Sequence, residues 1–126
     1  MIAFLDTHAF VLLGEARTDR FGADSRRLLV QADLCVSPAV LLELHFLFEI
    51  GRLAKGDPGG FHAAVLRDCD VRESPDPFAD VVRHAAALTW TRDPFDRLIV
   101  GAAALHRAKL ITKDANIHEH FAGAVW

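Results

Sequence analysis

The chain has 126 residues, with 14 basic against 17 acidic side chains and a formal net charge of −3. This length predicts one domain over residues 1–126, and the apolar fraction of 52% excludes an intrinsically disordered chain. The mild acidity argues against a protein that binds nucleic acid through bulk positive charge. Any such contact would need a local site, such as a bound cation.

No export or membrane signal is evident in the sequence. The longest apolar stretch, residues 98–105, is far shorter than the ~20 residues that a bilayer span requires. Residues 1–5 lack the basic start of a signal peptide and run directly into Asp6. Cys35 and Cys69 cannot build a disulfide scaffold, and Cys35 falls in a predicted strand, where a core role is expected. We therefore expect a cytoplasmic protein without membrane contact.

Short apolar runs alternate with longer helical stretches along the chain. Continuous apolar runs are typical of strands that are buried on both faces of a parallel sheet. They occur at residues 2–5, 34–36, around 71, 110–112 and 124–126. The helical stretches fall at residues 22–32, 37–50 and 93–107. This alternation predicts a three-layer α/β domain.

Two proline-containing pairs mark the starts of helices. Ser37-Pro38 and Asp93-Pro94 each combine a good N-cap residue with a proline, which is favoured at the first helical position. Gly51 should end the first helix, and the four glycines of residues 51–60 predict a loop or hinge. The helix over 37–50 carries more apolar side chains than one core face buries. We therefore expect a homodimer that uses this helix and the following loop.

Four acidic residues occupy positions that a solvated surface does not explain. Asp6 and Asp114 follow predicted strands, and ligands bind at the carboxyl ends of strands in such sheets. Asp96 lies in the first turn of a helix whose residues 98–105 are apolar all round, which predicts that the helix is buried and begins at the same edge. Glu43 interrupts the apolar segment 40–47, where an unpaired charge would be costly. These positions predict that the four carboxylates meet in one cleft.

Carboxylates gathered in one cleft repel one another and raise each other's pKa values. A hard divalent cation relieves that repulsion, and Mg²⁺ and Mn²⁺ take oxygen ligands while leaving positions for water and phosphate. Such an ion can activate a water molecule and neutralise charge on a phosphodiester. The acids therefore indicate a Mg²⁺ or Mn²⁺ site with hydrolytic chemistry.

Simpler roles are open for most of these acids taken singly. Asp6 and Asp114 can each cap a helix that follows them, and Asp96 can act as a capping-box acid. Asp93 is better explained as the N-cap before its proline than as a metal ligand. Glu43 alone lacks such an explanation, because an apolar helix face offers it no obvious partner.

Four segments together resemble the motifs of PIN-domain ribonucleases, and more closely those of VapC-type toxins. The resemblance covers nearly the whole chain, and the third segment is its most specific part. The segments are Phe4-Leu5-Asp6-Thr7-His8, Ser37-Pro38 through Leu42-Glu43-Leu44 to Gly51-Arg52-Leu53, Arg92 to Val100, and Leu110 to Asp114. The chain departs from many relatives at residues 11–13, where an aromatic residue is common, and at Thr91, where histidine is frequent. These departures leave the RNA preference open.

The resemblance implies a three-layer α/β/α fold around five parallel strands in the order 3-2-1-4-5. It implies a Mg²⁺- or Mn²⁺-dependent endoribonuclease, the toxin of a type II toxin–antitoxin pair, which forms a homodimer and is inhibited by a small antitoxin protein. The metal-binding and catalytic acids would then be Asp6, Glu43, Asp96 and Asp114. Among them, Glu43 would act as a ligand through water or as the general base.

Residues near these acids in the sequence are expected to support them. Thr7 or Thr112 could orient a carboxylate beside the metal. The basic residues that could contact substrate phosphates are Arg92, Arg97 and Lys113. For Arg97, an i,i+4 ion pair with Asp93 is the preferred interpretation.

Two other functions fit the acids less well. An aspartate-nucleophile phosphatase would use Asp6 but needs a second aspartate two residues later, where this chain has His8. A non-catalytic module would hold a basic peptide in the acidic cleft. An enzyme site should bind Mn²⁺ and lose it on Asp-to-Asn substitution, whereas a peptide cleft need not.

Overall fold

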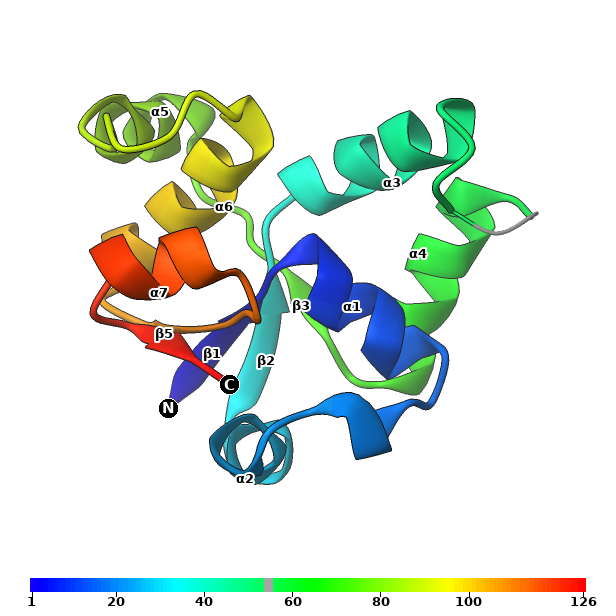
Figure 1. Cartoon of the computed structure of the whole chain (residues 1–126). Coiled ribbons are helices and arrows are strands. Elements are labelled where there is room, and N and C mark those ends of the chain that lie inside the picture. Colours follow the sequence, from blue (N-terminus) through cyan, green and yellow to red (C-terminus); the bar gives the residue numbers. More distant parts are fainter. Residues whose placement is uncertain (54–55) are drawn as a thin grey trace.

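A five-stranded parallel sheet forms the centre of the molecule (Figure 1). The computed structural model describes residues 1–53 and 56–126. The strands lie in the order β3-β2-β1-β4-β5, which confirms the expected topology. Phe4 of the central strand is paired with Cys35 on one side and Leu110 on the other. The strands are β1 Ile2–Leu5, β2 Asp33–Val36, β3 Arg72–Glu73, β4 Lys109–Ile111 and β5 Ala124–Val125.

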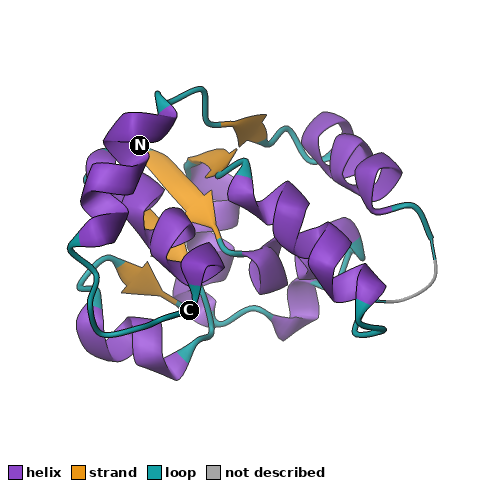
Figure 2. Ribbon diagram, turned by 90° about the horizontal axis from the view of Figure 1, so that it is seen from above, coloured by secondary structure: helices purple, strands orange, loops and turns teal. Residues whose placement is uncertain are grey.

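Helices pack on both sides of the sheet, so the predicted three-layer arrangement is confirmed (Figure 2). The helix α5 packs along α6, and α3 contacts both α4 and α6. Across residues 1–53 and 56–126, every helix is too short or too polar to cross a bilayer. The helices are α1 Thr7–Gly14, α2 Ala23–Gln31, α3 Ala39–Glu49, α4 Pro58–Asp68, α5 Phe78–Ala86, α6 Pro94–Leu105 and α7 Ala115–His120, with a 3₁₀ turn η1 at Thr18–Arg20.

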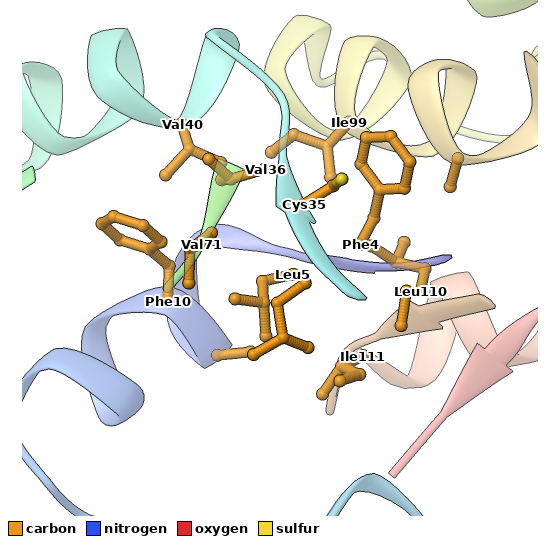
Figure 3. Packing of buried hydrophobic residues seen from close by; sticks show 14 of the residues in the cluster. Phe4, Leu5, Phe10, Cys35, Val36, Val40, Val71, Ile99, Leu110 and Ile111 are labelled. Atoms are coloured by element: carbon orange, nitrogen blue, oxygen red, sulfur yellow. The ribbon is translucent and has the colours of Figure 1, made fainter. Parts of the chain in front are cut away.

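The core lies around β1, whose apolar residues are buried on both faces. Phe4 points to the side of the sheet where Ile99 of α6 lies, and Leu5 points to the other side (Figure 3). Residues 99–103 of α6 are all buried, as its wholly apolar sequence predicts. Cys35 is also buried in this core, which agrees with the expected structural role. Two-sided burial explains why the strand sequences are apolar without alternation.

Two helices were not anticipated from the sequence. We expected residues 51–60 to form a loop, but α4 begins at Pro58, and the Asp57 carboxylate caps it by accepting a hydrogen bond from the Gly59 N–H at 3.1 Å. That expectation is therefore wrong for residues 58–60, and residues 54 and 55 lie outside the described ranges. Asp57-Pro58 is an N-cap followed by proline at the first helical position, a pair that predicts a helix start. The surrounding glycines favoured a loop instead, so this start was not recognised. The other helix, α5, buries Val81 and Ala85.

Gly101 allows α5 and α6 to approach closely. A Cβ atom at Gly101 would lie 3.1 Å from the Ala85 nitrogen and 3.2 Å from the Val81 oxygen. These neighbours are backbone atoms of α5, which cannot rotate away as a flexible side chain can. The close packing of the two helices therefore depends on the absence of a side chain at this position.

We predict that Gly101→Val lowers the free energy of unfolding by about 1–3 kcal/mol, the usual cost of overpacking. Thermal unfolding followed by circular dichroism measures the change. Ala86→Val is the matched control, because Ala86 is exposed on α5 and reports only the helix propensity of valine, at most about 0.7 kcal/mol. Equal melting temperatures for the two variants would contradict the prediction.

Candidate active site

Asp6 lies at the carboxyl end of β1 and caps α1. Its Oδ1 accepts a hydrogen bond from the Ala9 N–H at 2.8 Å, and the residue is only 8% exposed. Burial raises the pKa of this carboxyl, and hydrogen bonds from Thr112 and Ala9 lower it in part. The sequence left open whether Asp6 caps a helix or lies in the cleft. The same carboxylate does both.

Asp114 takes the equivalent position after β4. Its Oδ1 caps α7 by accepting from the Ile117 N–H at 3.0 Å. Its own N–H donates to Thr112 Oγ1 at 3.1 Å, and Thr112 is fully buried. Thr112 also lowers the pKa of the Asp6 carboxyl. The buried Thr112 hydroxyl is therefore placed to support Asp114 directly and to act on Asp6.

Asp93 and Asp96 lie at the start of α6. Asp93 caps the helix, because its Oδ1 accepts from the Phe95 N–H at 2.9 Å and the Asp96 N–H at 3.3 Å, as predicted. Asp96 is half-buried, and its pKa is raised to about 7. Burial is the main cause, and the remaining causes are the negative charges of Asp93, Asp114, Glu43 and Asp6. Burial and the neighbouring carboxylates therefore both favour the neutral form of Asp96.

Glu43 projects from the middle of α3 toward Asp6. Contrary to expectation, it has a partner, because the Thr7 hydroxyl donates a hydrogen bond to its Oε1. Burial raises the pKa of the Glu43 carboxyl, the Thr7 hydrogen bond opposes this, and the charges of Asp93 and Asp6 raise it further. Thr7 is itself buried beside Asp6, so it connects α1 to the acidic side chain of α3.

The four acids predicted from the sequence line one cleft. It has a volume of about 490 Å³, and its remaining lining residues are basic, polar or apolar. The full lining consists of Asp6, Thr7, His8, Val11, Glu43, Leu47, Arg52, Leu53, Asp96, Lys113 and Asp114. The carboxyl edge of the sheet and the start of α6 bring three of the acids together, and α3 brings the fourth.

The cleft supplies the oxygen donors that a hard divalent cation prefers. Across residues 1–53 and 56–126, no set of three His, Cys, Asp or Glu side chains is arranged closely enough to hold an ion. Asp6 and Asp114 each use Oδ1 for a helix cap, which leaves Oδ2 as the second acceptor of each carboxylate. The donor chemistry fits Mg²⁺ or Mn²⁺. The raised pKa of Asp96 comes mainly from burial and in part from the neighbouring negative charges, whose repulsion such a cation would relieve.

The basic residues expected near the acids have different positions. Lys113 lines the cleft, but Arg92 donates to the Thr89 carbonyl at 2.8 Å. The expected ion pair between Arg97 and Asp93 is wrong. Arg97 instead donates to the Ala85 and Ala86 carbonyls at 3.1 and 3.0 Å, because the end of α5 lies beside the start of α6 and its last carbonyl groups can accept side-chain hydrogen bonds.

Sequence reasoning missed two cleft residues, Arg52 and His8. Arg52 follows the glycine that ends α3, and His8 follows Asp6 by two positions in the first turn of α1. Both belonged to the quoted motifs, but neither was assigned a role. Gly51, which was expected to end α3, is the signal that could have directed attention to Arg52 directly after it.

The sequence matches the PIN domain family over residues 3–122, so the chain belongs to that family. No curated protein matches it significantly.

Three solved structures share its fold. VapBC2 from Rickettsia felis bound to a DNA fragment from its promoter aligns with a TM-score of 0.68 and 19% identity, over 94% of this chain and 92% of that one. A toxin–antitoxin complex from Klebsiella pneumoniae aligns with a TM-score of 0.63 and 18% identity, over 98% of this chain and 96% of that one. VapBC-1 from nontypeable Haemophilus influenzae aligns with a TM-score of 0.61 and 18% identity, over 100% of this chain and 96% of that one. At these identities, the likeness establishes the fold.

We predict that the metal-free protein loses stability as the pH rises from about 4.5 to 7.5. The folded-state pKa of Asp96, about 7, lies above its ordinary value of 3.8, so the folded state binds more protons between these two pKa values and this advantage is lost as Asp96 ionises. The raised pKa values of Asp6 and Glu43 act in the same direction, whereas the lowered pKa of the buried His62 opposes them. Melting temperatures in EDTA measure the effect. Asp96→Asn should make the pH slope shallower than that of the parent protein, and an unchanged slope would contradict the assignment.

Proposed function

We propose that this chain is a divalent-metal-dependent endoribonuclease, the VapC-type toxin of a type II toxin–antitoxin pair, acting in the cytoplasm as one domain over residues 1–126. The observation that carries the proposal is the meeting of four carboxylates in one cleft of a PIN-family chain. The shared fold with structures described as VapBC and toxin–antitoxin complexes supports the biological role.

In this proposal, the chain's own residues divide the work. Asp6, Asp96 and Asp114 hold Mg²⁺ or Mn²⁺, with Glu43 as a ligand through water or as the general base. A bound ion of this kind lowers the pKa of a coordinated water and screens the charge of a phosphodiester. Thr7 fixes the orientation of the Glu43 carboxylate through its hydrogen bond. The raised pKa of Glu43 suits a group that accepts a proton from an attacking water near neutral pH.

A small antitoxin protein is proposed to occupy an apolar groove that adjoins the cleft. The groove has a volume of about 530 Å³ and shares Val11 and Leu53 with the acidic cleft. Phe48 and Phe61 supply aromatic surface along it. A segment of the antitoxin that lies in this groove would end at the acids and could close the cleft to RNA.

We predict that Asp6→Asn and Asp96→Asn each lower the rate of RNA cleavage by at least about 10²–10³, the cost of losing one electrostatic component of a catalytic site. Asparagine preserves size and, at Asp6, the oxygen that caps α1, so both variants should fold. Cleavage of a fluorogenic RNA in Mg²⁺ or Mn²⁺ measures the rate. Binding of Mn²⁺ should stabilise the parent protein by ~2.7 kcal/mol at a hundredfold excess over Kd. The resulting rise in melting temperature should be smaller in both variants.

Asp93→Asn is the internal control for these variants. Asparagine retains the N-cap to Phe95 and Asp96, and Asp93 lies outside the cleft lining, so most activity should persist. If Asp93→Asn is as inactive as Asp96→Asn while both are folded, or if Asp6→Asn cleaves at the parental rate, the metal assignment fails.

We also propose that the chain forms a homodimer through α3 and α5. Only Val40 and Leu44 of α3 are buried, whereas Leu42 is 63% exposed, and Phe78 at the start of α5 is 70% exposed. Leu42 and Phe78 line a common, largely apolar groove of about 370 Å³. A second copy of the chain would cover this surface.

We predict that Leu42→Glu shifts the protein from dimer to monomer, because a charge at the centre of an apolar interface is left desolvated and unpaired. Light scattering at tens of micromolar protein, the order of concentration at which a micromolar Kd gives mostly dimer, measures the mass. Val30→Glu is the control, since Val30 is 86% exposed on α2 and should not affect assembly. A monomeric parent protein would rule out the proposal.

A further inference from the structure

Two basic residues from different elements line the acidic cleft. Lys113 lines it beside Asp114, between β4 and α7, and Arg52 lines it beyond the end of α3. In Figure 1, α7 and α3 lie on opposite sides of the start of α1, where Asp6 is. Both side chains belong to exposed residues, and neither makes an ion pair within residues 1–53 and 56–126.

The backbone of Arg52 is fixed by the way α3 ends. Gly51 adopts a left-handed φ of +77°. Its N–H donates to the Phe48 carbonyl at 3.1 Å, and the Arg52 N–H donates to the Leu47 carbonyl at 2.8 Å. These are the paired hydrogen bonds of a Schellman motif, which glycine favours because it has no Cβ. The motif places Arg52 next to Leu47 and Leu53, which also line the cleft.

Lys113 is held from both neighbouring residues and from its side chain. The N–H of Thr112 donates to the Val125 carbonyl at 3.0 Å, and the N–H of Asp114 donates to Thr112 Oγ1 at 3.1 Å. The Lys113 ammonium lies over the ring of Trp126, 6.0 Å from its centre, within the range of a cation–π contact. Lys113 therefore presents its charge from a defined turn at the rim.

We infer that Arg52 and Lys113 bind the RNA phosphates that lie on either side of the phosphate being cleaved. This inference rests on the proposed function. A net charge of −3 and an acidic floor repel RNA, so the affinity must come from local cations that are kept away from neutralisation by the acids. Basic side chains at the edge of an acidic cleft can bind the phosphates of an RNA backbone that lie next to the cleaved one. They disfavour a basic peptide, which both cations would repel.

The test measures binding without turnover. In the Asp96→Asn protein, fluorescence anisotropy follows a short fluorescein-labelled single-stranded RNA of mixed sequence across a KCl titration. Arg52→Ala and Lys113→Ala should each weaken binding about tenfold, as expected for one charge-assisted contact. Each should also reduce the slope of log K against log[KCl] by about 0.7, one phosphate contact on a single strand. Arg52→Lys should restore the slope but not the full affinity.

The matched controls are Arg26→Ala on α2 and Lys109→Ala at the opposite end of β4 from Lys113, which remove the same charges elsewhere. If the Arg52 and Lys113 variants bind like these controls while the Asp96→Asn protein itself binds RNA, the inference fails and the proposed function stands. If the Asp96→Asn protein binds no RNA and the parent protein cleaves none, both fail. With Asp96 restored, Arg52→Ala should raise KM more than it lowers kcat, and the reverse would assign Arg52 to the chemical step and overturn the inference.

Discussion

The arrangement of this molecule depends on confining like charges at one edge of a parallel sheet. Three backbone devices hold the acids in place: the N-caps of α1, α6 and α7, which are made by Asp6, Asp93 and Asp114. Each cap gives a carboxylate hydrogen bonds from helix N–H groups and the favourable end of the helix dipole. These interactions offset part of the cost of burial and of repulsion, which together raise the pKa of Asp96 to about 7. The same helix starts that stabilise the fold therefore also concentrate the charge.

The cleft joins parts of the chain that are far apart in the sequence. Thr7 connects α1 to Glu43 on α3, and the Thr112 hydroxyl accepts the Asp114 N–H and lowers the pKa of the Asp6 carboxyl. Thr112 is in turn held by His118, whose Nε2 lies 2.7 Å from the Thr112 carbonyl oxygen. Hydroxyl groups thus position the acids, while the cations Arg52 and Lys113 remain at the rim. This separation keeps positive charge near the acids without neutralising them.

The sheet and most of the acidic cleft could be predicted from the sequence. Strands that are buried on both faces give a continuous apolar pattern, and two of the acids follow such strands directly. The five strands, their order and the four acids of the cleft were anticipated on that basis and from the family resemblance. The helix α4 was missed because glycine dominates its start, although Asp57 provides the cap. The partners of Glu43 and Arg97 depend on how α1 meets α3 and how α5 meets α6, which local pattern does not encode.

Substitution should affect the four cleft acids differently, because two of them also cap a helix and two do not. Alanine at Asp6 or Asp114 removes a helix cap together with a cleft carboxylate, and a lost cap alone typically costs about 1 kcal/mol. Glu43 and Asp96 cap nothing, and losing Asp96 even relieves repulsion. Under the proposed function, selection for loss of toxicity with retained antitoxin binding should therefore recover a wide range of substitutions at Glu43 and Asp96. At Asp6 and Asp114 it should be restricted to residues that can still begin a helix, with asparagine foremost.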